Sequence, residues 1–147
     1  MADLETQGRH GIALRVRPER LAICQLGPGS SPPWGQLGGG FWAVAHTEEE
    51  LSVVLPENCI GPDWPAEGSC RAEQGWRCLE VIGPLDLGLT GVLAQLSAPL
   101  ADAGIPIFVL STYNTDEILV REAHLERAIA ALTGRGYRVE REPEQHS

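Results

Sequence analysis

The sequence predicts an α/β fold in which two helices cover one face of an antiparallel sheet, and three observations support this prediction. Residues 76–139 contain apolar segments in the order strand, helix, strand, strand, helix, strand. This βαββαβ order defines the ferredoxin-like two-layer α+β sandwich. Each helical segment carries a single apolar stripe, and the first half of the chain repeats part of the same pattern.

The first half of the chain predicts short strands joined by loops. Ile12–Val16 alternates apolar and charged residues, which is typical of a half-buried strand. Gly29–Gly40 contains two prolines and five glycines, and this composition excludes a long helix. The expected strands are Ile12–Val16, Leu21–Leu26, Phe41–His46 and Leu51–Leu55, and Asn58–Gly75 is expected to be a loop.

The second half begins with an apolar strand, Trp76–Ile82, which Gly83-Pro84 ends. A helix is expected from about Leu89 to Ala103, with its leucines on one face. Pro99 removes one hydrogen bond and should kink the last turn, and Gly104 suits the left-handed position after the helix. The remaining predicted elements are two strands, a helix closed by Gly134 and a short last strand, at Ile105–Tyr113, Asp116–Val120, Glu122–Thr133 and Tyr137–Val139.

The two halves look like one unit written twice, because each contains a strand closed by Gly-Pro, at Gly27-Pro28 and at Gly83-Pro84. We therefore predict two units, a degenerate one at residues 11–75 and a complete one at residues 76–140. The first unit has a Pro/Gly loop where the second has its first helix. Residues 1–10 and 141–147 are polar and are expected to be flexible tails.

Composition and charge exclude several classes of function. The formal net charge is −9, with 11 basic residues among 20 acidic ones, so nucleic acid and anionic membranes are poor partners. No apolar segment approaches the roughly 20 residues that span a bilayer. The N-terminus has no apolar core and is not expected to be a signal peptide. Four cysteines are too few for a disulfide scaffold, which favours a reduced, cytoplasmic protein.

The start of the first helix, Gly88-Leu89-Thr90-Gly91, is the first candidate binding site. The first N–H groups of a helix lack partners and carry about half a positive charge, so they can bind a carboxylate. Glycine lets the backbone approach such a ligand closely. The other interpretation is that Gly88 and Gly91 permit close helix–strand packing, with Thr90 as an N-cap.

The second candidate is the hairpin between the two central strands. It contains five side chains with hydroxyl or amide groups, at residues 111–115, and ends in a carboxylate, Asp116, which can bind an ammonium or guanidinium group. We expect this hairpin and the helix start to approach a common cleft, which would suit an amino-acid zwitterion. The other interpretation is an ordinary β-turn. The candidate residues are Ser111, Thr112, Asn114, Thr115 and Asp116.

Catalytic and metal sites have weaker support. Zinc could use three cysteines and His46, but the Cys-x-x-Cys spacing of a preformed site is missing. A small enzyme that uses Cys24 or Cys78 with His46 remains an alternative, although no nucleophile elbow accompanies these residues. Gly27-Pro28-Gly29 is not followed by the Gly-Lys pair of a phosphate loop. We therefore expect no catalytic residues, no bound metal and no cofactor.

Two of these segments also carry a family resemblance. Gly83-Pro84-Leu85-Asp86-Leu87-Gly88-Leu89-Thr90-Gly91, followed by Ala103-Gly104-Ile105-Pro106-Ile107, resembles ACT-domain proteins. So does Leu110-Ser111-Thr112-Tyr113-Asn114-Thr115-Asp116-Glu117-Ile118-Leu119-Val120. More closely, the chain is similar to small tandem-ACT proteins related to aspartate-kinase regulatory regions and to the animal cytosolic arginine sensors. The resemblance covers about Arg15–Val139.

The resemblance implies a non-catalytic module that binds an amino acid, often at an interface between ACT units. By this analogy, Gly88–Gly91 and Ser111–Asp116 form the pocket. Exposed sheet edges favour a homodimer, and a regulatory role implies a protein partner. The alternative is a structural protein–protein interaction module that binds no small ligand.

Overall fold

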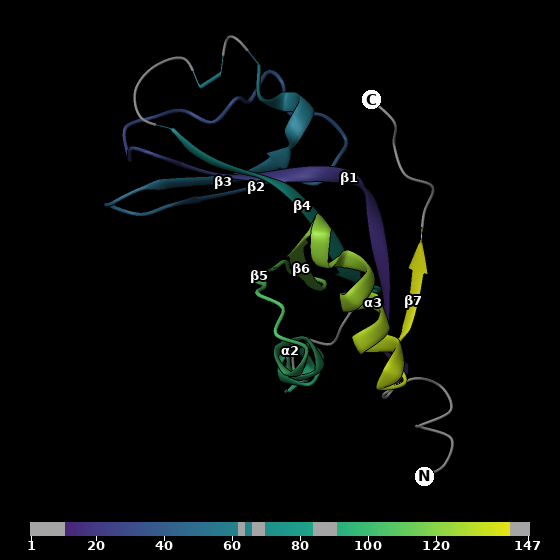
Figure 1. Ribbon diagram of the computed structural model, residues 1–147. Helices are drawn as coiled ribbons and strands as arrows, with labels where there is room; N and C mark the ends of the chain where they lie inside the picture. Colours follow the sequence, from purple (N-terminus) through teal and green to yellow (C-terminus); the bar gives the residue numbers. More distant parts are fainter. Residues whose placement is uncertain (1–10, 62–63, 66–69, 84–90, 142–147) are drawn as a thin grey trace. The chain divides into compact units, whose positions relative to one another are not determined.

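The computed structural model describes residues 11–61, 64–65, 70–83 and 91–141 (Figure 1). The chain divides into two compact units. The terminal unit combines Met1–Pro18 with Arg77–Ser147, and the middle unit is Glu19–Trp76. The predicted division into 11–75 and 76–140 differs from this one at the N-terminal end. Residues 12–16 belong to the terminal unit because Ile12, Leu14 and Val16 are buried in its core.

Strand β1, Ala13–Leu26, is continuous where the sequence predicted two strands, so this prediction was wrong. Pro18 lies at the predicted break. On one side, β1 pairs with β7 (Arg138–Arg141) over residues 13–16 and with β3 (Leu51–Pro56) over residues 21–26. Pro18 falls between these two pairings, so its missing N–H removes no backbone hydrogen bond from either pair of strands.

Strand β4, Arg71–Val81, begins five residues before its predicted start at Trp76. The prediction that the preceding loop extends to Gly75 was therefore wrong. Residues 71–74 are exposed and three of the four are polar, so their sequence lacks the apolar alternation that identifies a half-buried strand.

The sheet of the terminal unit has the strand order β7-β1-β4-β6-β5, with β5 at Phe108–Ser111 and β6 at Asp116–Arg121. β5 and β6 form the predicted antiparallel hairpin, and β7 runs parallel to β1. The predicted βαββαβ segment supplies four strands of this sheet, and β1, from outside that segment, lies between β7 and β4. The βαββαβ order of β4, α2, β5, β6, α3 and β7 is the predicted one.

Two helices belong to the terminal unit, α2 at Val92–Asp102 and α3 at Leu125–Gly134, which follows a short 3-10 turn, η3, at Glu122–His124. α3 packs beside β7 (Figure 1). α2 contains Pro99 and is followed by Gly104 with a φ of 72°, as predicted. The prediction for Gly134 was wrong: this residue is still helical, and the positive φ of 91° belongs to Gly136.

Both helices bury their apolar faces against the same face of this sheet. On three adjacent strands, alternate residues point into one core, as the period of two in a strand requires. The helices contribute Leu96, Leu100 and Leu132, which are fully buried. The sheet residues of this core are Leu14, Val16, Leu79, Val81, Ile118 and Val120. The predicted two-layer α/β fold is therefore confirmed.

The middle unit has the strand order β2-β3-β1-β4, with β2 at Ala43–His46 and the short turn η2 at Glu57–Cys59 after β3. A smaller core includes Cys24, Val53, Leu55 and Trp64. In the described part of this unit the structure contains no α-helix, in agreement with the prediction from Gly29–Gly40. None of the described helices of the chain is long and apolar enough to cross a membrane.

Candidate functional site

Helix α2 begins after a glycine whose backbone is in the left-handed conformation. Gly88, Leu89 and Thr90 lie outside the described residues. Gly91 is the N-cap residue of α2 with a φ of 78°, and its carbonyl oxygen accepts the Gln95 N–H at 2.9 Å. No side chain caps this end of the helix, and its first turn contains no acidic residue. The positive end of the helix dipole is therefore not neutralised by the described residues of α2 itself.

The predicted hairpin is closed by a set of short hydrogen bonds. Ser111 Oγ donates to Asp116 Oδ1 at 2.7 Å, and these two residues are paired across β5 and β6. The Thr112 N–H donates to the Thr115 carbonyl oxygen at 2.8 Å, and the Thr115 N–H donates to Thr112 Oγ1 at 3.1 Å. Side chains and backbone thus fix the hairpin conformation, while Ser111, Thr112 and Asn114 are exposed to solvent.

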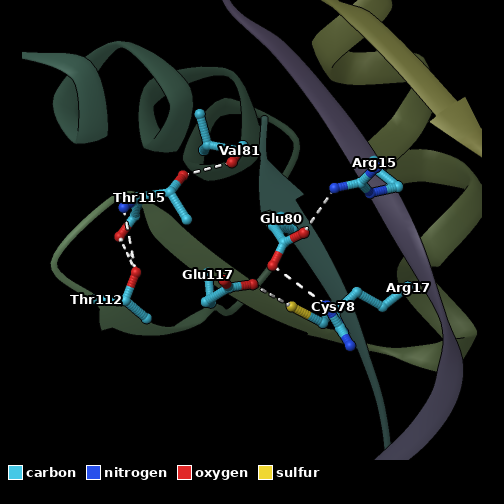
Figure 2. Close-up of polar contacts among 8 residues, drawn as sticks. All are labelled: Arg15, Arg17, Cys78, Glu80, Val81, Thr112, Thr115 and Glu117. Carbon is cyan, nitrogen blue, oxygen red and sulfur yellow. Dashed lines mark hydrogen bonds and ion pairs between the residues drawn. The ribbon is translucent and has the colours of Figure 1, made fainter. Parts of the chain in front are cut away.

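Thr115 ties this hairpin to the end of β4. Its hydroxyl donates to the carbonyl oxygen of Val81, the last residue of β4 (Figure 2). In the sequence, β4 is followed by the predicted carboxylate site, Gly88–Gly91. The hairpin is therefore attached to the end of β4 that precedes this site. The structure thus brings the predicted hairpin residues together. The approach of Gly88–Gly91 to Asp116 stays a prediction.

A second polar cluster, which sequence reasoning missed, lies on the sheet of the terminal unit (Figure 2). Arg15 Nη2 lies 3.0 Å from Glu80 Oε1, and Arg17 Nη1 lies 3.3 Å from Glu80 Oε2. The Cys78 thiol donates to Glu117 Oε2 at 3.1 Å, and the carboxyl groups of Glu80 and Glu117 are hydrogen-bonded. We call Arg15, Arg17, Cys78, Glu80 and Glu117 the sheet cluster.

The two carboxyl groups of the sheet cluster differ in acidity. Burial, the hydrogen bond with Glu80 and the charge of Glu80 raise the pKa of Glu117 to about 8, and Cys78 and Arg17 act in the opposite direction. Burial also opposes ionisation of Glu80. Hydrogen bonds with Glu117 and Arg15 and the charge of Arg17 outweigh that effect, so the pKa of Glu80 lies below its usual value.

A signal for the sheet cluster was present in the sequence. In β1 and in β4 its members are two residues apart, and they alternate with the core residues Leu14, Val16, Leu79 and Val81. The cluster therefore occupies the sheet face opposite the helices. Recognising it also required the knowledge that β1, β4 and β6 are neighbours.

The thiol groups do not support the alternative of a cysteine enzyme. Burial raises the pKa of Cys24 to about 12, and burial and Glu117 raise the pKa of Cys78 well above its usual value. A thiolate nucleophile needs the opposite shift. His46 Nε2 lies 3.1 Å from the carbonyl oxygen of Pro28. Within the described ranges, no three His, Cys, Asp or Glu side chains gather in a group that could hold a metal ion.

Fold and site together define a class: a ferredoxin-like α/β protein with a hydrogen-bonded polar hairpin next to the end of its first βαβ strand. A sequence profile of the ACT domain matches residues 71–134, which include β4, α2, β5, β6 and α3. This match assigns residues 71–134 to the ACT-domain family.

The relatives found by sequence comparison include proteins named cytosolic arginine sensors. The bovine (Bos taurus) cytosolic arginine sensor for mTORC1 subunit 1 is 33% identical over 97 residues, which are 63% of this chain and 30% of the relative. Putative protein CASTOR3P of Homo sapiens is 30% identical over 92 residues, 58% of this chain and 56% of the relative. The matched part of the chain thus spans about a third to a half of these relatives.

Solved structures give the same fold. Protein Atu0741 from Agobacterium tumefaciens is 32% identical with a TM-score of 0.80, and the match covers 92% of this chain and 97% of that one. The regulatory subunit of aspartate kinase from Thermus flavus has a TM-score of 0.62 at 10% identity, over 84% of this chain and 96% of that one. The second similarity concerns the fold alone.

Proposed function

We propose that this chain is a non-catalytic regulatory protein of the cytoplasm that binds an amino acid. The observation that carries the proposal is the hairpin Ser111–Asp116, whose backbone is fixed by Thr112 and Thr115 and anchored to the end of β4. An ordered set of polar groups suits a small zwitterion, because little ordering is left to occur on binding. The relatives named arginine sensors favour arginine as the first ligand to test.

Each part of the proposed pocket has one role. The backbone N–H groups of Gly88–Gly91 hold the α-carboxylate at the positive end of α2. Asp116 binds the cationic end of the ligand, either the ammonium group or a guanidinium group. Ser111, Thr112, Asn114 and Thr115 shape the pocket. That the ligand is held between ACT units is also part of the proposal.

A second candidate function is a structural interaction module that binds no small ligand. One observation favours it: Ser111 donates a hydrogen bond to Asp116, so one carboxylate oxygen has a partner within the hairpin itself. In that case the hairpin is a stable turn, and the family fold serves only to contact another protein.

The two candidates are separated by a thermal-shift screen with the twenty amino acids. A ligand that binds only the folded chain stabilises it by about 2.7 kcal/mol at a hundred times its Kd, which is a clear rise in melting temperature. We expect a rise with one amino acid or a few related ones, confirmed by calorimetric titration. An unchanged melting temperature across the whole panel at millimolar concentration contradicts amino-acid binding and favours the structural module.

The role of Asp116 is tested with two variants that separate charge from hairpin structure. Asp116→Asn keeps an oxygen that can accept from Ser111 but removes the charge, and Ser111→Ala removes the hydrogen bond but keeps the charge. For a cationic ligand we expect at least a tenfold loss of affinity in Asp116→Asn and a smaller loss in Ser111→Ala. Equal affinity of Asp116→Asn and the unaltered chain removes Asp116 from the pocket.

A further inference from the structure

The sheet cluster places two carboxyl groups in contact on neighbouring strands. Glu117 of β6 is almost fully buried, at 2% exposure, and Glu80 of β4 is hydrogen-bonded to it. Two ionised carboxylates in contact in a poorly hydrated position repel each other strongly. One proton between them removes this repulsion and supplies the donor that a carboxyl–carboxyl hydrogen bond needs.

The other groups around Glu117 offset a second negative charge only in part: Arg17 and Cys78 favour the Glu117 carboxylate, but burial and Glu80 outweigh them. On β1, both arginines are directed to Glu80: Arg15 binds one of its oxygens and Arg17 the other (Figure 2). On β4, the Cys78 thiol donates to Glu117 but carries no charge. On β5, Leu110 is paired with Glu117 and is apolar. The two arginines of the sheet cluster thus form ion pairs with Glu80, the carboxyl group that is ionised.

We propose that Glu80 and Glu117 bind one proton between them in the folded chain, and that release of this proton loosens the contact between β4 and β6. The sheet cluster is therefore a proton-sensitive element built into the sheet. Glu117 directly follows Asp116, which ends the hairpin, so a loosened β6 also affects the hairpin. The proposal is independent of whether an amino acid binds.

The direction in which stability changes with pH follows from proton binding. The pKa of Glu117 is raised in the folded chain, from the usual 4.5 to about 8. Between these values the folded chain holds a proton that the unfolded chain has lost, so stability decreases as the pH rises through this window. Once the folded chain has also released the proton, above the upper value, this contribution stops changing.

The test compares the chain with Glu117→Gln, which keeps the shape and removes the titration. Melting temperatures are measured by circular dichroism from pH 5.5 to 9. We expect a decrease with pH in the unaltered chain and a clearly smaller decrease in Glu117→Gln. Glu126→Gln is the matched control, because Glu126 is exposed on α3 and pairs with Arg141, and it should retain the full decrease. The same decrease of melting temperature with pH in all three proteins overturns the proposal.

Carbon-13 NMR of the glutamate carboxyl groups provides a measurement that does not depend on a variant. One signal, assigned to Glu117 because Glu117→Gln or Glu117→Asp changes it, should titrate near pH 8, and the Glu80 signal should stay ionised. Cys78→Ala removes a hydrogen bond that favours the Glu117 carboxylate, so it should move the midpoint to higher pH. Titration of every glutamate between pH 4 and 5 in the unaltered chain also overturns the proposal.

Discussion

At the residue scale, two glycines of the terminal unit should respond oppositely to the same substitution. Gly91 has a φ of 78°, where an L side chain is strained, so Gly91→Ala should destabilise the chain by about 1–2 kcal/mol. Gly134 is the last residue of α3, and a Cβ there meets nothing within 4 Å. Gly134→Ala should stabilise by about 0.5–1 kcal/mol because alanine favours the helix. Urea unfolding measures the change in the free energy of unfolding for both variants. A change in the same direction in both contradicts the assigned conformations.

The cysteines allow a second prediction at this scale. Cys24 is buried in β1 with a pKa raised to about 12, so its thiolate fraction at neutral pH is roughly a thousandth of that of an ordinary thiol. Cys24 and Cys78 should therefore be alkylated by iodoacetamide at least a hundredfold more slowly in the folded chain than in concentrated urea. Peptide mass spectrometry gives the rate at each site. Fast labelling of either thiol in the folded chain would restore the possibility of a cysteine nucleophile.

At the element scale, the hydrogen bond from Thr115 to Val81 attaches the hairpin to β4. Thr115→Val keeps the side-chain shape but leaves this contact without a donor, so we expect a destabilisation of about 1–2 kcal/mol. Thr133→Val is the control. Among the described residues its hydroxyl bonds to Ala130, in its own exposed helical turn, so its effect should stay within about 0.5 kcal/mol. Equal losses in the two variants would mean that the Thr115 contact does not stabilise the hairpin.

Element types were predictable where one periodicity dominates the local sequence. The stripe of Leu96 and Leu100 fixed α2, and the positive φ at Gly104 was expected because glycine favours that position. Predictions failed where the deciding contact is distant in sequence. Pro18 is tolerated in β1 because of the spacing between two partner strands, and the polar start of β4 is a strand because β1 lies next to it. Neither pairing is encoded in the local pattern.

At the scale of the whole molecule, the two polar sites differ in how far apart their residues lie in the sequence. The hairpin is contiguous in sequence, so its residues could be named as a group before the fold was known. The sheet cluster joins three strands whose members lie up to about a hundred residues apart, and its unusual carboxyl chemistry arises only from strand order. The alternation of a strand can assign Glu80 and Glu117 to a sheet face, but it cannot show that they touch.

The predicted homodimer is also a property of the whole molecule, and the sheet edges of the terminal unit indicate where it would form. β7, at one edge, carries Arg138, Glu140 and Arg141, and charged edges oppose pairing with another chain. β5, at the other edge, is Phe-Val-Leu-Ser and carries no charge. A second copy is therefore expected to pair along β5, burying the uncharged edge in both chains.

Light scattering over a concentration series tests this dimer. The unaltered chain should have the mass of two copies at micromolar concentration. Leu110→Lys places a charge on β5 and should shift the mass to that of one copy, whereas Val139→Lys, on the charged β7 edge, should leave the dimer in place. Circular dichroism must show that both variants stay folded, because both side chains are partly buried. A monomer at high concentration contradicts the dimer altogether. Loss of the dimer in Val139→Lys alone would place the contact at the other edge, since the two substitutions add the same charge to opposite sides of one sheet.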